Sequence, residues 1–359
     1  MNNTEQQQTK VLKESKNRIR VDFERTSRWT RFRIKYLNSN YAVMLLYRMF
    51  RFLLLLGVAF VILFPFYSKI FGSFMDREDF VDVTVKLIPK HWTIDQYKYI
   101  ITENGFFKAM GNTFILSLVC ALLQTITCCI IAYGFAKFKF KFNKLLFMLV
   151  IFTMVVPHIV LRYAMISEFN YFKPLYLEAF WNGIKNIAGE GGFIAGFKSA
   201  KGFNLLNSYW PMAILSVTGL AYKNGLYIFM LRQFFKGVPD ELEESAYIDG
   251  SGVFRTFVTI IIPLSVPMML TVFIFAFSWQ WTDNFYTNMF FNNAGPKLIP
   301  SIVRVPKSLS TDASFAGKKN YDSAIRNTCS LLIILPLIIL YLFFQKSLVQ
   351  GIERSGITG

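Results

Sequence analysis

Residues 232–250 read RQFFKGVPDELEESAYIDG, a charged stretch that separates two apolar blocks and ends in a glycine. Pro239 suits the first position of a helix, where its missing N–H costs nothing. The acids at 240, 241, 243 and 244 complement the positive end of the helix dipole. Gly250 can end this helix with a positive φ. The second half of the stretch therefore predicts a short helix.

The residues after Gly250 predict a second short helix. Ser251 can cap it, and residues 253–262 lead into the next apolar block. Ser245 and Ala246 are small enough for another protein to approach the first helix closely. From the residues alone, a plain acidic connector between two membrane spans is the simpler interpretation.

Long apolar blocks dominate the rest of the chain. Of its 359 residues, 53% are hydrophobic and 17% aromatic, and the mean hydropathy is +0.38. A helix needs about 20 mostly apolar residues to cross a bilayer, and in lipid it satisfies its own backbone hydrogen bonds. We therefore predict an all-α integral membrane protein with six spans, at 50–71, 112–135, 145–163, 209–231, 263–281 and 328–344.

The distribution of charge predicts the orientation. The net charge is +17; residues 1–49 are strongly basic, and a second basic segment at 137–144 connects the second and third spans. Basic segments beside spans stay on the cytoplasmic side, so both termini are expected there. The loop at 283–327 would then face outward, although its bases outnumber its acids. This topology signal accounts for the basic charge, and no nucleic-acid partner is expected.

These predictions divide the chain into three parts and mark three segments within the largest one. The parts are a basic cytoplasmic segment at 1–49, a six-helix transmembrane domain at 50–346 and a cytoplasmic tail at 347–359; the segments are the acidic loop at 232–262, an outer insertion at about 167–208 and the outer loop at 283–327. The insertion is too short to carry a core of its own. No soluble catalytic domain is therefore expected.

Individual side chains point to no catalytic or metal chemistry. The four cysteines lie inside apolar blocks, and the two histidines have no carboxylate or cysteine cluster around them, so no metal site is predicted. Lys223 and Asn224 fall inside the fourth predicted span, where polar groups should face a cavity or another helix. Lys223 and Asn224 could line the substrate path or form hydrogen bonds between helices, and the sequence does not distinguish these two roles. Two roles are possible for the tryptophans near the span ends: stacking on a sugar or lying in the aromatic belt at the membrane interface. These residues are Trp210, Trp279 and Trp281.

The acidic loop resembles the EAA loop of ABC-importer permeases. That pattern is Glu-Ala-Ala, three residues, Gly, nine residues, Ile, one residue and Leu-Pro. The matching positions here are Glu244, Ser245, Ala246, Gly250, Ile260 and Pro263. Ser245 replaces one alanine and Ile262 replaces the leucine. The RQFF at 232–235 and the Ile-Asp-Gly at 248–250 resemble the carbohydrate branch, the family of the maltose transporter's smaller permease.

The resemblance covers most of the chain after residue 50. Further matches to that branch are FPFY at 64–67, Asn112-Thr113, AYGFA at 132–136 and LLNSYW at 205–210. The basic leader and the insertion around 172–203 lie outside the pattern, and the resemblance gives them no role.

The resemblance implies a type I ABC-importer permease that crosses a bacterial cell membrane several times. It implies a transmembrane subunit that forms the translocation pathway for a sugar or oligosaccharide. Its partners would be a second homologous permease in a heterodimer, a cytoplasmic ATPase dimer, an extracellular solute-binding protein, the sugar substrate and membrane lipid. ATP and Mg²⁺ would bind the partner ATPase, so this chain would be no enzyme and would carry no cofactor.

The resemblance also implies which residues couple the chain to the ATPase. They are Glu244, Ser245, Ala246, Asp249, Gly250, Ile260 and Pro263. Glu244 would bond to the ATPase, Ala246 would allow its close approach, and Gly250 would make the turn.

Other functions remain as alternatives at this level. The same machinery could import an amino acid, a peptide or a polyol, and no residue is assigned to substrate. A multispan membrane enzyme would need converging catalytic groups, but no paired-carboxylate, HExxH or Ser/His/Asp arrangement lies in or beside the spans. A sensor or scaffold would show no ATP-driven flux in vesicles.

Overall fold

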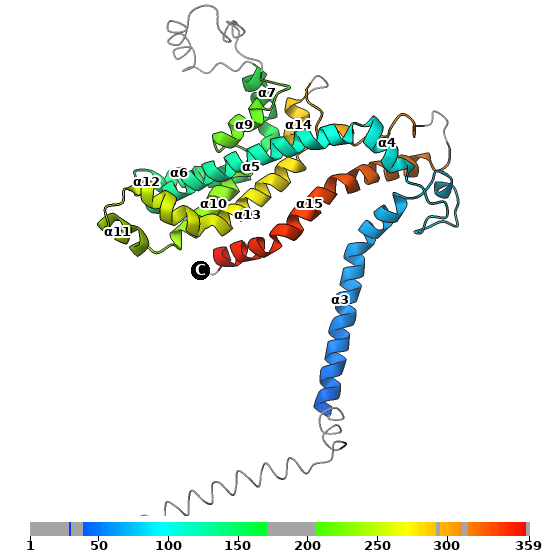
Figure 1. The fold of residues 1–359 in the computed structure, drawn as a ribbon, viewed down its shortest axis with the longest axis horizontal. Helices are drawn as coiled ribbons and strands as arrows, with labels where there is room; N and C mark the ends of the chain where they lie inside the picture. Colours follow the sequence, from blue (N-terminus) through cyan, green and yellow to red (C-terminus); the bar gives the residue numbers. More distant parts are fainter. Residues whose placement is uncertain (1–28, 30–38, 171–204, 292–294, 311–314, 357–359) are drawn as a thin grey trace, which may run out of the picture. The chain divides into compact units, whose positions relative to one another are not determined.

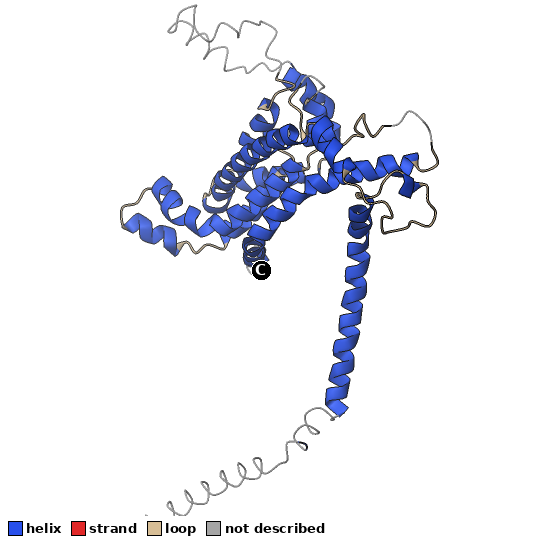
Figure 2. Cartoon of the chain, turned by 45° about the vertical axis from the view of Figure 1, so that its right-hand side comes forward, coloured by secondary structure: helices blue, strands red, loops and turns tan. Residues whose placement is uncertain are grey.

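The computed structural model describes residues 29, 39–170, 205–291, 295–310 and 315–356. Within these ranges the chain consists of helices and loops (Figure 2), with one isolated antiparallel bridge between Met75 and Trp92. Most of the basic segment, most of the outer insertion and the end of the tail lie outside the described residues. The chain forms two compact units, residues 1–68 and 69–359.

Helix α3 (Ser39–Gly72) supplies nearly all the described residues of the first unit. Its side chains from 43 to 68 are exposed, apart from the half-buried Ala59. The helix begins at Ser39, 11 residues before the apolar block at 50–71, and continues without a break through that block. A helix that is apolar all round suits a lipid environment.

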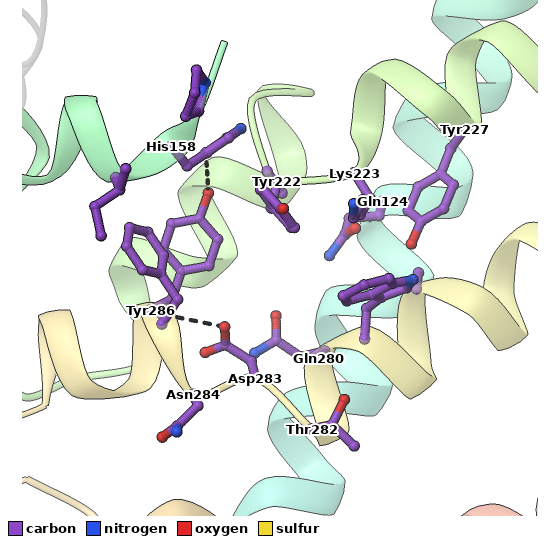
Figure 3. A pocket seen from close by; sticks show the side chains of 16 residues that line it. Gln124, His158, Tyr222, Lys223, Tyr227, Gln280, Thr282, Asp283, Asn284 and Tyr286 are labelled. Atoms are coloured by element: carbon purple, nitrogen blue, oxygen red, sulfur yellow. Dashed lines mark hydrogen bonds between the residues drawn. The ribbon is translucent and has the colours of Figure 1, made fainter. Parts of the chain in front are cut away.

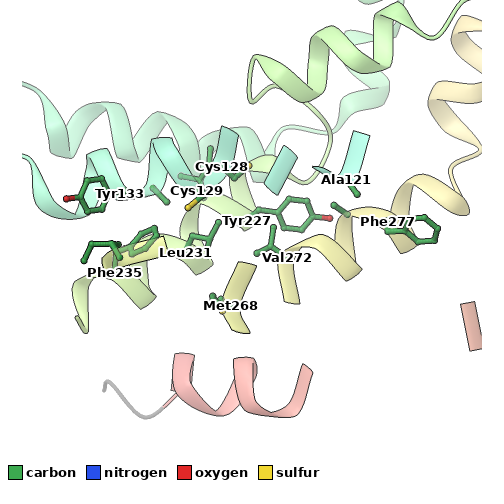
Figure 4. Packing of buried hydrophobic residues seen from close by; sticks show 14 of the residues in the cluster. Ala121, Cys128, Cys129, Tyr133, Tyr227, Leu231, Phe235, Met268, Val272 and Phe277 are labelled. Atoms are coloured by element: carbon green, nitrogen blue, oxygen red, sulfur yellow. The ribbon is translucent and has the colours of Figure 1, made fainter. Parts of the chain in front are cut away.

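Helix α5 (Phe106–Lys137) lies at the centre of the second unit. It packs against α9 (Trp210–Val217), α10 (Asn224–Lys236) and α13 (Ile262–Trp281) (Figure 1). Figure 4 shows part of this core, in which Cys128 and Cys129 of α5 lie near Leu231 of α10 and Met268 of α13. The cysteines are free and buried. They fill the core as small apolar side chains do.

The long helix α15 (Lys318–Gly356) packs against α13 and against the short helix α4 (Asp95–Glu103). Buried polar contacts fix one end of this assembly. Asn104 Nδ2 donates hydrogen bonds to the carbonyls of Ile302 and Arg304, each at 2.9 Å. Thr113 Oγ1 accepts the N–H of Ile299 at 3.0 Å, which ties the start of α5 to the short helix η5 (Ile299–Ile302).

In the part of the chain that the structure describes, four helices are long and apolar enough to cross a membrane: Val43–Gly72, Phe106–Lys137, Val253–Trp281 and Lys318–Lys346. The third predicted span corresponds to α6 (Asn143–Val155), followed by η2 (His158–Leu161) and α7 (Arg162–Asn170). The chain bends by 91° between Asn143–Val155 and His158–Asn170, and these two segments make a fifth crossing only if they count as one. Pro157 lies at this bend with extended backbone.

The fourth predicted span, 209–231, is not a continuous helix. Helix α9 ends at Val217 and α10 begins at Asn224. Gly219 between them has φ +76°, a left-handed conformation that an α-helix does not accommodate. The N–H groups of Leu220 and Ala221 both bond to the carbonyl of Leu215, which closes the turn. Hydropathy correctly marks an apolar segment here, but the backbone turns within it.

The close contact of α10 with α6 leads to a stability prediction. A Cβ added to Gly225 of α10 would lie 2.8 Å from Met154 Cγ and 3.0 Å from the carbonyl oxygen of Val150. The backbone atom cannot rotate away, so Gly225→Ala should force the helices apart and cost about 1–3 kcal/mol. Gly111→Ala in α5 is the matched control, because its Cβ would meet nothing within 4 Å.

Thermal unfolding of both variants in detergent measures the difference. Gly111→Ala should unfold at or above the wild-type temperature, because alanine favours a helix over glycine by about 1 kcal/mol. Gly225→Ala should unfold lower. Equal midpoints for the two variants would contradict the close packing of α10 on α6.

Candidate functional site

Two short helices form a bent element between α10 and α13, which we call the acidic hairpin (residues 238–256). Helix α11 (Glu241–Ile248) leads to a turn at Gly250, and α12 (Val253–Thr256) continues through the π-helical turn η4 (Phe257–Ile261) into α13. The predicted pair of helices is therefore present.

Gly250 makes the turn, as the sequence predicts. Its φ is +80°, and the N–H of Ser251 reaches the carbonyl of Ala246 at 2.9 Å. Two details of the prediction are wrong. Asp240, not Pro239, directly precedes α11, and Gly252 rather than Ser251 is the N-cap of α12. Gly252 is extended, with φ −79° and ψ 162°, so the chain enters α12 without a side-chain cap.

The predicted coupling residues lie on and around one surface of the hairpin. A shallow hollow of about 370 Å³ is lined by four of them, Ser245, Ala246, Asp249 and Ile260. Glu244, Gly250 and Pro263 are exposed and lie outside its lining. Ala246 is itself buried. The hairpin thus offers a concave surface with small side chains and an exposed carboxylate beside it.

Two large apolar side chains on the hairpin project into solvent. Ile248 is 86% exposed and Phe254 is 79% exposed. Isolated apolar residues on a charged surface are typical anchors for a partner protein. In the sequence, Ile248 marked only the resemblance to the carbohydrate branch and Phe254 was not singled out, because sequence alone does not show which apolar residues of this stretch are exposed.

A buried lysine joins the hairpin to α5. Lys137 Nζ donates to the carbonyl of Val238 at 2.8 Å and to Asp240 Oδ1 at 2.6 Å, and it lies 3.5 Å from Glu243 Oε1. The Lys137 and Glu243 side chains are only 7% and 9% exposed. The hydroxyl of Tyr133 donates to Glu243 Oε2 at 3.3 Å. We call this group the Lys137 clamp.

The Lys137 clamp was not predicted from the sequence. Lys137 was interpreted as a topology signal, and Glu243 as a partner of the helix dipole. The ammonium group holds the pKa of the Asp240 carboxyl below its ordinary value, by a hydrogen bond and by charge. The ring of Tyr133 packs on Phe257 with centroids 4.5 Å apart. The ion pair of Lys137 and the contact between the rings of Tyr133 and Phe257 together hold the hairpin against α5.

A second hollow lies deeper in the second unit, and we call it the aromatic pocket (Figure 3). It measures about 370 Å³ and forms where helices break or end: at Pro157, at the turn between α9 and α10, and after α13. Irregular backbone at membrane depth is tolerated where it lines a cavity. The pocket therefore explains why the third and fourth predicted spans are interrupted.

The structure places the intramembrane residues that the sequence analysis left open. Lys223 lines the aromatic pocket, with Nζ 4.2 Å from the ring centroid of Tyr222 and 4.5 Å from that of Trp279. Asn224 is fully buried outside the lining. Trp281 is also buried, and its Nε1 donates to the carbonyl of Ile333 at 3.0 Å, so it has a packing role.

Polar groups on the other side of the aromatic pocket are bonded to each other. Tyr286 Oη lies 2.8 Å from His158 Nδ1. The carboxylate of Asp283 accepts the N–H of Tyr286 at 3.2 Å and both the N–H and hydroxyl of Thr287 at 2.8 and 3.0 Å. Across the described ranges, no group of three or more His, Cys, Asp or Glu side chains is arranged to hold a metal ion.

Membrane-length helices, a charged hairpin tied to one of them and a pocket at their breaks define a multi-pass membrane protein. Residues 124–354, more than half of the chain, match the family described as "Binding-protein-dependent transport system inner membrane component". The chain belongs to this family. It is a permease subunit of a transport system, so the resemblance drawn from the acidic loop is confirmed.

Curated relatives are similar over most of their length. Protein LplC of Bacillus subtilis (strain 168) is 26% identical, over 84% of this chain and 92% of its own. The polygalacturonan/rhamnogalacturonan transport system permease protein YtcP of the same organism is 25% identical, over 85% and 96%. The arabinooligosaccharides transport system permease protein AraQ of Halalkalibacterium halodurans is 26% identical, over 84% and 93%.

A solved structure has the same fold. It is a chain from the crystal structure of a bacterial ABC transporter involved in the import of the acidic polysaccharide alginate. The TM-score is 0.59 at 17% identity, and the similarity covers 84% of this chain and 96% of that chain. The fold is therefore that of an ABC transporter permease.

The Lys137 clamp leads to a prediction about stability. Lys137→Met would leave the carboxylate of Glu243 buried without its cation, and such a change typically costs about 3–5 kcal/mol. The thermal midpoint in detergent should fall clearly. Lys139→Met is the matched control, because Lys139 is exposed and should leave the midpoint unchanged.

The double variant Lys137→Met/Glu243→Gln separates charge from packing. Removing the buried negative charge should restore part of the lost stability. A Lys137→Met midpoint equal to that of Lys139→Met would show that the clamp contributes nothing.

Proposed function

We propose that this chain is the transmembrane subunit of an ATP-driven importer for an oligosaccharide or polysaccharide fragment, delivered by an external binding protein. The acidic hairpin carries the proposal, because it presents a hollow, small side chains and an exposed carboxylate at the end of a rigid joint. The relatives named for polygalacturonan, arabinooligosaccharides and galactooligosaccharides support the substrate class. The membrane would be the plasma membrane of a bacterium.

The proposed topology has six crossings with both termini in the cytoplasm. Three crossings are the continuous helices α3, α5 and α15, and a fourth is α13 with the segment that precedes it. The bent α6–α7 pair and the broken α9–α10 pair would supply the other two. Lys137, Lys139, Lys141 and Lys144 at the end of α5 and in the following loop support a cytoplasmic side for the acidic hairpin.

The acidic hairpin would be the docking surface for a partner ATPase. Glu244 would bond to that partner, Ala246 would let it come close, and Ile248 and Phe254 would enter its apolar pockets. ATP and Mg²⁺ would be held by the ATPase. Closure of an ATPase dimer would push the hairpin, and the Lys137 clamp would pass the movement to α5. A second permease would complete the pathway, whose two states differ in the side on which it opens.

Gly250 provides the sharpest test of the coupling role. A valine at φ +80° is strongly disfavoured, although a Cβ there meets nothing within 4 Å, so Gly250→Val should distort the turn without a clash. ATP-driven uptake by the complete transporter in proteoliposomes should be lost while the chain still enters the membrane. Gly252→Val is the matched control: the residue is extended and equally open, so uptake should persist. Normal uptake by Gly250→Val would rule out the coupling role.

Glu244 tests the docking contact itself. Its side chain is exposed, so Glu244→Lys should leave the fold intact but reverse the charge that faces the ATPase. Co-purification of the ATPase with the permease should drop at least tenfold, and uptake should fall with it. The control Glu241→Lys changes an exposed acid of the same helix that lies outside the coupling motif. Equal ATPase recovery from both variants would place the contact elsewhere.

A further inference from the structure

The aromatic pocket contains a lysine, Lys223, that has no ion-pair partner among the described residues. The ion pairs of the described ranges involve Lys90, His91 and Lys137. A lysine in an apolar segment is costly, and such residues usually mark a substrate or ion pathway or have a partner. The rings of Tyr222 and Trp279 hold the ammonium in place through cation–π contacts. Those contacts leave its N–H donors free.

The acid and the imidazole of the same pocket are already occupied. Three hydrogen bonds from Tyr286 and Thr287 satisfy the carboxylate of Asp283. His158 is bonded to the hydroxyl of Tyr286. Figure 3 shows these groups on one side of the pocket and Lys223 with Gln124 and Tyr227 on the other. Of the charged groups that line the pocket, Lys223 is therefore the one with hydrogen-bonding capacity left for a ligand.

The surroundings of Lys223 favour an anion further. Lys223 is the N-cap of α10, a helix of 13 residues, so the partial positive charge of the helix end adds to its own. The hydroxyl of Tyr227 lines the pocket, is fully buried and has no hydrogen-bond partner among the described residues. A buried hydroxyl without a partner indicates a ligand atom that it is placed to bond.

The walls of the pocket suit a sugar ring. Trp279 is half-exposed, and so is Tyr222, and their rings are 6.1 Å apart at an interplanar angle of 70°. Aromatic faces bind apolar ring faces, while Gln124 and Asn284 contribute amide groups to the lining. A few polar groups in an aromatic hollow are the usual composition of a small-molecule site.

We propose that the aromatic pocket is a subsite for an acidic sugar, a hexuronate unit of the transported oligosaccharide. Lys223 binds the carboxylate, the hydroxyl of Tyr227 bonds to the same unit, and Trp279 or Tyr222 stacks against its ring. This inference rests on the proposed function and makes it more specific. A neutral sugar has no group that would offset the charge of Lys223.

The test uses the complete transporter in proteoliposomes with its binding protein. The probes are oligogalacturonides, oligomannuronates and glucuronoxylan fragments, each as the free acid and as the methyl ester, with neutral galacto- and arabino-oligosaccharides beside them. The wild type should take up a free acid and discriminate against its ester. Lys223→Gln should raise the concentration for half-maximal uptake of that acid by about 10- to 100-fold, the effect of a lost charge-assisted hydrogen bond. Lys223→Arg should keep most of the uptake.

Two further variants control for structure. Lys98→Gln removes an exposed lysine that also lies over an aromatic ring, at 5.8 Å from Tyr99, but stands outside the pocket, so uptake should not change. Tyr227→Phe keeps the ring and removes only the hydroxyl, and it should weaken acid uptake several-fold even if Lys223→Gln fails to assemble.

The outcomes separate the two proposals. Uptake of neutral or esterified glycans in preference to free acids overturns the acidic subsite and leaves the importer intact. Unchanged acid uptake by both Lys223→Gln and Tyr227→Phe also overturns the acidic subsite and leaves the proposed importer function intact. No uptake of any glycan by an assembled transporter overturns the proposed function itself.

Discussion

A stripe of small side chains along α5 is the contact on which the second unit depends. Its members recur every three or four residues and are all buried: Ala109, Thr113, Ser117, Ala121, Thr125, Cys128 and Ala132. Residues at this spacing share one face of a helix. In lipid, burying an apolar side chain between helices gains little free energy, because the lipid tails are equally apolar. Close packing of the helix backbones therefore holds the helices together. The stripe lets α10 and α13 pack directly on α5. Its effect is a rigid block with α5 at its centre.

The same helix connects the two sites. Lys137, its last residue, enters the clamp of the acidic hairpin, and Gln124 lines the aromatic pocket. Thirteen residues separate these positions in the sequence, which is about 20 Å along a helix. At the other end, Thr113 is bonded to Ile299 in the segment that connects α13 to α15. A force applied to the hairpin would therefore act on the pocket through one stiff element rather than through a chain of side chains.

Lys137 and Lys223 show that the two sites differ in how a charged side chain is satisfied. Lys137 has three oxygen-bearing partners, two of them carboxylates, and serves structure, because removing the lysine would leave the buried carboxylate of Glu243 without its counterion. Lys223 contacts two aromatic rings and forms no ion pair with the described residues. The charge of Lys137 is neutralised by carboxylates of its own chain. Lys223 has capacity left for a ligand, and the breaks of the neighbouring helices provide the room around it.

Local patterns in the sequence determined the long apolar helices, the basic connector and the turn at Gly250. These depend on neighbours within a few residues: hydropathy over one span, or the freedom of glycine to take positive φ. They were enough to identify the acidic hairpin and, by resemblance, the family. The break in the fourth predicted span was missed because a hydropathy window averages across Gly219 and does not register its φ.

Tertiary structure alone decided which residues meet. Lys137 and Glu243 are more than 100 residues apart. Lys223 lies before α10 and Asp283 after α13, so no pattern along the chain pairs or separates them. Whether a lysine is neutralised depends on the packing of α5, α10 and α13, which sets the distances between their side chains. The sequence by itself determined that polar groups enter the membrane segment. Only the folded arrangement decided that Lys137 is buried against acids and Lys223 faces an open pocket.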